Sequence, residues 1–145
     1  PEGAAGYKTN LTHWLKELEE LDTTLELICG GAARRDIVVA HEAFGYLCAR
    51  YDLHQVAVQG LAPEGEPTPA QMAQVTDFVR ENDVKVIFFE PSASPKVAEA
   101  IARETGAETA VLSPVESLSA EQIEAGADYF SVMRANIAAL EKALY

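Results

Sequence analysis

Three side chains that can bind a metal ion or transfer a proton come after apolar runs of the sequence. His41 follows residues 37–40, Glu90 follows residues 84–89, and Glu116 comes a few residues after another such run. One imidazole with one or two carboxylates is a common ligand set for zinc or another borderline divalent metal. His41 and Glu90 also have the chemistry of an acid and base pair. The residue types therefore indicate a metal site or a proton-transfer site.

A less specific interpretation explains the same residues without a site. His41 would cap the helix that follows it, and the two glutamates would be solvated loop residues. Spacing along the sequence leaves both interpretations open. The other histidines are weaker candidates, because His13 is predicted on the outer side of the first helix and His54 just before a strand, where histidine is usually exposed.

The apolar runs predict the strands of a parallel sheet. Four short runs alternate with helical periodicity and no hairpin signal separates them, which favours right-handed crossovers and helices on both faces of the sheet. The predicted strands are 37–40, 56–58, 84–89 and 109–112. The fold class is therefore α/β, a Rossmann-like lobe with a four-stranded parallel sheet. A strand order of 2-1-3-4 would place the switch point between the strands that end at His41 and Glu90.

Periodicity also predicts the helices. They are expected over 6–28, from Glu42 to Tyr51, from the Thr68 cap to Asn82, from Ser94 to Gly106, in a short turn opened by Ser119 and Glu121, and over 129–144. The first is long for a helix that only covers a small sheet, and its outer face is charged, so we interpret it as a strut leading to another domain. Gly30 and Gly31 are expected to end it. Glu42 is expected in the first turn of the second helix.

The two cysteines do not define a redox compartment. Cys48 shares an apolar helix face with Phe44 and Leu47 and is expected to be a buried free thiol. Cys29 follows the first predicted helix, where an exposed thiol is equally compatible with the pattern. The sequence does not establish a disulfide between them, because it does not give the distance between their Cα atoms.

Composition excludes several classes of function. The 145 residues suffice for one domain, and 48% hydrophobic residues suffice for one core. A net charge of -12 argues against nucleic acid or anionic membrane surfaces and is compatible with a cationic ligand. No apolar run approaches the roughly 18 residues of a membrane span, and no export signal stands at the start.

Two catalytic classes also lack their motifs. The turn after the first strand, from Ala40 to Ala43, has no glycine and carries Glu42, so it does not suit a nucleotide phosphate. No G-x-S-x-G is present, and the sequence context singles out none of Ser92, Ser94 and Ser113 as a nucleophile.

Three stretches of the sequence resemble one known family. They are VVAHEAFGYLCARYDL (38–53), GLAPEGEPTPAQMAQVTDFVRENDVKVIFFEPSASPKVAEAIARETGAETAVLSPVESL (60–118) and AGADYFSVMRANIAALEKAL (125–144). They are similar to the C-terminal lobe of the zinc-binding solute-binding proteins of metal ABC importers, the ZnuA-like and AdcA-like group. In that family a long rigid helix joins two lobes that hold the metal between them. The resemblance implies that residues 1–31 end that helix, that 32–145 are the metal-binding lobe, and that the N-terminal lobe is absent.

The resemblance also implies a role for each candidate residue. His41 matches the metal-binding histidine of the second lobe. Manganese-binding relatives carry glutamate there, so the match favours Zn²⁺, with Mn²⁺ as the alternative. Glu116 matches the region that supplies an acidic fourth ligand in part of the family, where other members use water. Glu90 would orient the ligands from behind. The two histidines of the first lobe and the family's histidine-rich loop have no counterpart here.

The function that the resemblance implies is capture and delivery, without catalysis. Such a protein lies outside the cytoplasm, in the periplasm or as a surface lipoprotein, and passes zinc to an ABC permease. In this chain the loop around Glu64 to Thr68 is the expected contact with the permease. Three alternatives stay open: a manganese-binding member of the family, an acid-base enzyme lobe using His41 and Glu90, and a non-catalytic interaction or adhesion domain.

Overall fold

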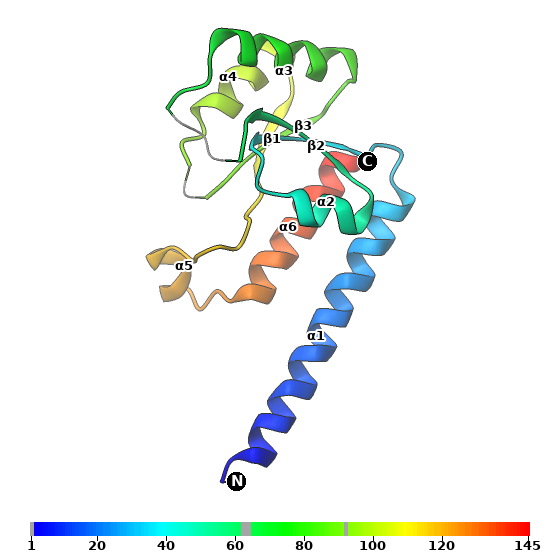
Figure 1. The fold of residues 1–145 in the computed structure, drawn as a ribbon, viewed down its shortest axis with the longest axis vertical. Helices are drawn as coiled ribbons and strands as arrows, with labels where there is room; N and C mark the ends of the chain where they lie inside the picture. Colours follow the sequence, from blue (N-terminus) through cyan, green and yellow to red (C-terminus); the bar gives the residue numbers. More distant parts are fainter. Residues whose placement is uncertain (1, 62–64, 92) are drawn as a thin grey trace.

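The structure is a parallel sheet covered by helices on both faces, with one long helix projecting from it (Figure 1). The computed structural model describes residues 2–61, 65–91 and 93–145. The elements are α1 (Ala4–Gly31), β1 (Asp36–His41), α2 (Gly45–Tyr51), β2 (His54–Gln59), α3 (Pro69–Glu81), β3 (Val86–Phe89), α4 (Lys96–Thr105), β4 (Glu108–Val111), α5 (Ala120–Glu124) and α6 (Tyr129–Leu144). The strand order is β2-β1-β3-β4 and every pairing is parallel, so the predicted fold class and strand order are confirmed.

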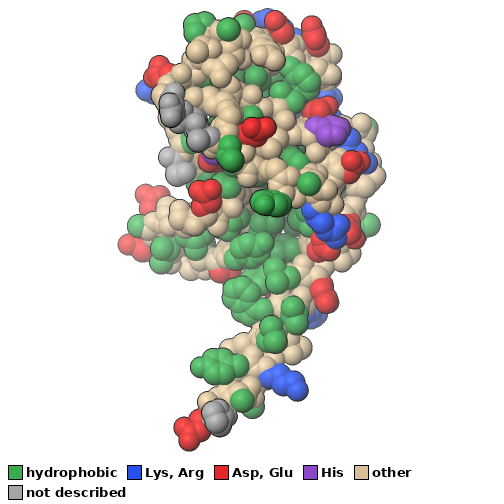
Figure 2. Space-filling view, in the orientation of Figure 1, with side chains coloured by type: hydrophobic (Ala, Val, Ile, Leu, Met, Phe, Trp, Pro, Cys, Tyr) green, Lys and Arg blue, Asp and Glu red, His purple; other side chains and the backbone are tan. Residues whose placement is uncertain are grey.

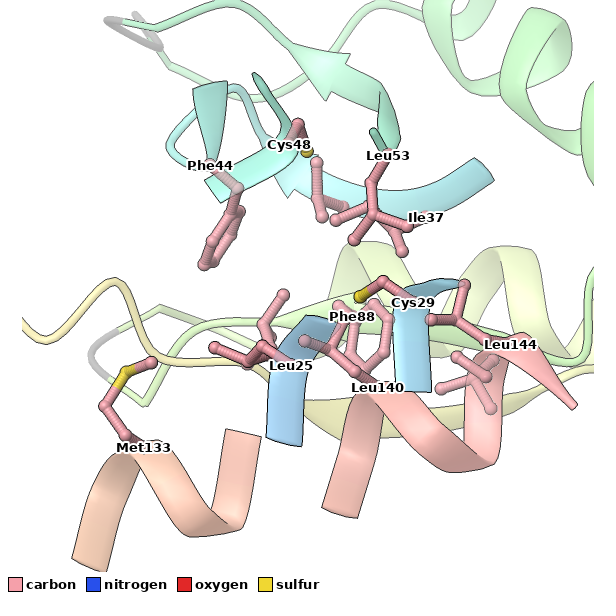
Figure 3. Packing of buried hydrophobic residues seen from close by; sticks show 14 of the residues in the cluster. Leu25, Cys29, Ile37, Phe44, Cys48, Leu53, Phe88, Met133, Leu140 and Leu144 are labelled. Carbon is pink, nitrogen blue, oxygen red and sulfur yellow. The ribbon is translucent and has the colours of Figure 1, made fainter. Parts of the chain in front are cut away.

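Alternation along the strands divides the core into two clusters, one on each face of the sheet. Val38 and Ile87 pack with α3 and α4 on one face. Val39 and Phe88 face the other way and pack with α1, α2 and α6, where Leu25, Cys29 and Leu140 meet the sheet (Figure 3). Both faces of β1 and β3 are therefore buried, which explains their continuous runs of apolar residues.

The projecting helix α1 is covered only near its C-terminal end. Leu21, Leu25 and Cys29 are buried, whereas Leu11 and Trp14 are 58% and 49% exposed although they belong to the same apolar pattern. Hydrophobic side chains accordingly gather on the surface over α1 and its neighbours (Figure 2). In the described ranges no helix combines the length and apolar character needed to cross a membrane.

The end of α1 differs from the prediction. Gly30 and Gly31 belong to the helix instead of ending it, and Ala32 is the C-cap. A Cβ atom on Gly31 would come within 2.7 Å of the Tyr145 hydroxyl, which donates a hydrogen bond to the carbonyl of Ile28 at 3.1 Å. The glycine therefore allows the chain's last residue to pack against the helix end.

The start of α2 also differs from the prediction. Glu42 was expected in its first turn, but the helix begins at Gly45 with Phe44 as N-cap. The chain turns first: the Ala43 N–H donates to the His41 carbonyl, and the Phe44 N–H donates to Oε1 of Gln55. Because residues 41–43 form this turn, Glu42 lies outside the helix and not in its first turn.

Cys29 is buried, so the alternative of an exposed thiol is wrong. The reason is the longer α1, whose last turns pack against the sheet. Cys48 is buried as predicted, and burial raises the pKa of its thiol to about 11. Both thiols are free.

The core contacts of α6 generate a stability prediction. Leu140 is fully buried between α6 and the sheet, whereas Leu27 on α1 is 71% exposed. Leu140→Ala should lower the free energy of unfolding by about 3 kcal/mol, because it leaves a cavity. The matched control Leu27→Ala should change it by less than about 0.5 kcal/mol. Urea denaturation followed by circular dichroism measures both, and equal effects would contradict this description of the core.

Candidate metal site

The pairing of β1 with β3 brings His41 and Glu90 together. Val39 is paired with Phe88, and His41 and Glu90 each come two residues later. Residues two apart in a strand point to the same face, so the imidazole and the carboxylate extend from one edge of the sheet on the same side. This is the carboxyl edge, where open parallel sheets bind ligands.

His41 and Glu90 are in direct contact. Nδ1 of His41 meets Oε1 of Glu90, and the two side chains are 20% and 8% exposed. Among the described residues, none forms a hydrogen bond of regular geometry with Oε1 of Glu90. The polar group in contact with this oxygen is the imidazole of His41. Burial raises the pKa of Glu90, while its interaction with the His41 imidazole opposes that rise and the nearby Glu116 carboxylate adds to it.

The less specific interpretation of His41 and Glu90 is therefore wrong. The N-cap of α2 is Phe44, so His41 does not cap the helix. Glu90 is buried and is not a solvated loop residue. His13 and His54 are both exposed, as predicted for surface residues.

Glu116 lies close enough to influence Glu90 but is itself exposed. It lines a small cavity of about 100 Å³ together with Pro91 and Ser113, whereas His41 lines a separate cleft of about 430 Å³ with Gln59 and other residues. Across 2–61, 65–91 and 93–145, no three His, Cys, Asp or Glu side chains converge on one point as a metal site requires. The described side chains alone therefore do not form a complete metal site, and Glu116 and His41 as zinc ligands stay a prediction.

Other predicted participants have mixed outcomes. Glu64, at the start of the loop expected to contact a permease, and Ser92 lie outside the described residues. Ser94 accepts a hydrogen bond from the Lys96 N–H beside α4, and Ser113 is buried in the backbone network before Glu116.

Sequence analysis missed Asn136 of α6. Its amide is buried and forms hydrogen bonds with both the N–H and the carbonyl of Ser113, at 2.9 and 2.8 Å. The available signal was a polar residue within the apolar stripe of α6, between Met133 and Leu140. Its partner is 23 residues away in the sequence, so only the fold identifies it.

Comparison with known proteins identifies the family of this chain. The model of the ZnuA family, described as zinc-uptake complex component A, periplasmic, matches residues 1–143. The chain belongs to the ZnuA family. It is 39% identical over 140 residues to the zinc-binding protein AdcA of Streptococcus pyogenes and 38% identical over 144 residues to the high-affinity zinc uptake system protein ZnuA of Bacillus subtilis.

Solved structures with a similar fold include one ZnuA-like domain and one laminin-binding protein. The Zn(II)-bound ZnuA-like domain of Streptococcus pneumoniae AdcA is similar with a TM-score of 0.81 at 36% identity, over 99% of this chain and 54% of that chain. The laminin-binding protein Lbp of Streptococcus pyogenes is similar with a TM-score of 0.82 at 36% identity, over 100% of this chain and 56% of that chain.

This ZnuA-family chain is shorter than the relatives it matches. The match covers 97% of this chain but 27% of the Streptococcus pyogenes AdcA, and 99% of this chain but 45% of the Bacillus subtilis ZnuA. The relatives therefore contain large parts with no counterpart in these 145 residues.

The buried carboxyl of Glu90 generates a pH prediction. Since its pKa is raised in the folded state, the native protein holds this proton more tightly than the unfolded chain does. The stabilisation is complete below about pH 4 and is lost as the pH rises through the folded-state pKa. The free energy of unfolding of the wild type should therefore fall relative to that of Glu90→Gln as the pH rises from about 4 through the folded-state pKa of Glu90.

Denaturant unfolding at several pH values measures this difference, with the exposed Glu81→Gln as the matched control. The control should follow the wild type at every pH. If the difference in free energy of unfolding between the wild type and Glu90→Gln did not change with pH, burial would not raise the pKa of this carboxyl.

Proposed function

We propose that this chain is the metal-binding lobe of a solute-binding protein that captures zinc outside the cytoplasm and delivers it to an ABC permease. The contact between His41 and Glu90 at the carboxyl edge of the sheet carries the proposal. It is supported by membership of the ZnuA family, whose relatives include the zinc-binding lipoprotein AdcA of Streptococcus pneumoniae, 37% identical over 142 residues. The site residues are His41 and Glu116 as ligands and Glu90 as their support.

Glu90 gives His41 the orientation that a metal ligand needs. A carboxylate beside Nδ1 favours the tautomer with the proton on that nitrogen, which leaves the lone pair of Nε2 free for the ion. Because Glu90 is buried, it contacts Nδ1 on the side of the ring opposite the proposed ion and does not compete for the ion. Imidazole nitrogen is a ligand that zinc accepts readily, whereas Mn²⁺ prefers oxygen, so His41 favours zinc over the manganese alternative.

The two proposed ligands leave the zinc shell incomplete. A closed site has about four ligands, and His41 with Glu116 supplies two. The relatives' additional length is the natural source of the others, so we expect the whole protein to close the site and this chain alone to bind weakly. An open shell of this kind also allows release toward a permease.

The chief alternative is an acid-base enzyme. His41 and Glu90 lie in contact, which meets the first geometric requirement for proton transfer. The two functions differ in their need for metal: turnover that persists with a chelator would favour the enzyme, and metal-dependent binding without turnover favours the transport protein.

Zinc titration of the purified chain tests the proposal. We expect a dissociation constant of about micromolar or weaker, because roughly half of the ligands are supplied. His41→Ala should weaken zinc binding by at least about tenfold, and Glu116→Gln should weaken it less. Competition with a chromophoric chelator gives these constants.

The control is His54→Ala, which removes an exposed histidine from the opposite end of the strands. It should leave the constant unchanged. A nanomolar constant that His41→Ala does not alter would place the zinc elsewhere and overturn the assignment of the site.

A further inference from the structure

We propose that Asn136 is a positioning residue for the Glu116 carboxylate, acting through Ser113 and the left-handed backbone of Val115. The inference rests on the proposed function, because it concerns how one proposed ligand is presented. It starts from a buried amide, a hydroxyl and one unusual backbone conformation in the segment that joins β4 to α5.

The first step fixes the start of this segment against the sheet. The Leu112 N–H donates to the Phe89 carbonyl at 2.9 Å, which extends the pairing of β4 with β3 up to the residue before Glu90. The next residue, Ser113, is bound by Asn136 of α6. Oδ1 of Asn136 accepts from the Ser113 N–H, and Nδ2 of Asn136 donates to the Ser113 carbonyl. Asn136 and Ser113 are 5% and 7% exposed, so water does not compete for these bonds.

The second step turns the chain toward Glu116. Val115 has a φ of 58°, which a β-branched residue rarely adopts and which persists only where the surroundings enforce it. Two contacts hold Val115 in this conformation: its N–H donates to Oγ of Ser113 at 3.1 Å, and its side chain packs against the core cluster formed with α1, α2 and α6. The intervening Pro114 fixes its own φ and so limits the conformations open to this turn.

The consequence is that the backbone carrying the Glu116 side chain is fixed before any ion binds. Glu116 follows Val115 directly and lies close enough to Glu90 to act on it electrostatically. A ligand held in place loses less conformational entropy on binding than a ligand on a free loop. Asn136 therefore contributes to zinc affinity without touching the ion.

A double-mutant cycle separates positioning from general stability. Zinc alone is titrated into the full chain and into Asn136→Ser, Glu116→Gln and the double variant, with unfolding measured on each. Asn136→Ser should weaken zinc binding by about tenfold. In the Glu116→Gln background the same change should have almost no effect on zinc binding, because the ligand it positions is already removed.

A second pair of variants covers the case in which Asn136→Ser does not fold. Ser113→Ala removes the hydroxyl that accepts from Val115, and Ser113→Thr keeps a hydroxyl at the same place. The same cycle with Glu116→Gln is then run on Ser113→Ala. Zinc affinity should fall in Ser113→Ala and be restored in Ser113→Thr.

The outcomes distinguish this inference from the proposed function. If Glu116→Gln weakens zinc binding but the Asn136 or Ser113 change has no effect, or an equal effect in both backgrounds, positioning is overturned and the metal site stands. If Glu116→Gln leaves zinc binding unchanged, Glu116 is not a ligand and both statements about it are overturned.

Discussion

The parallel pairing of β1 with β3 is the constraint on which the rest of the site depends. Its register aligns Val39 with Phe88 and so places His41 beside Glu90, although the two are far apart in the sequence. A shift of one residue would send the two side chains to opposite faces of the sheet. The apolar residues that hold this register, buried on both faces, therefore determine the chemistry at its edge.

The same pairing makes the burial of Glu90 tolerable. A carboxylate removed from water is costly unless a positive or donating partner meets it, and here the partner is the ring of His41. Each group thus constrains the other: the imidazole offsets the burial of the carboxylate, and the carboxylate orients the imidazole. A metal ion bound at Nε2 would increase the positive charge of the ring and strengthen this interaction.

Polar contacts join the projecting helix α1 to α2, beside the buried apolar residues that pack it on the core. Arg50 of α2 donates to Asp22 and Glu26 of α1, both at 2.8 Å, and the Tyr51 hydroxyl donates to Asp22 at 2.7 Å. Below them the edge-on contact of Trp14 with Phe130 joins α1 to α6. These contacts hold α1 in a defined position, with its N-terminal apolar residues exposed. The relatives are longer than this chain, so they contain residues that could cover this apolar surface.

The sequence by itself determined the elements of this protein, their α/β class and the position of His41 at a strand end. Periodicity and caps are local signals, so α6 was predicted with its exact bounds and the Thr68 capping box of α3 is present. Only the tertiary structure decided the burial of Cys29, the turn that excludes Glu42 from α2 and the role of Asn136. The burial of Cys29 and the bonds of Asn136 arise from contacts between residues distant in the sequence, which no local pattern encodes. The turn before α2 combines the local bond from Ala43 to His41 with the bond from the Phe44 N–H to the side chain of Gln55 on β2.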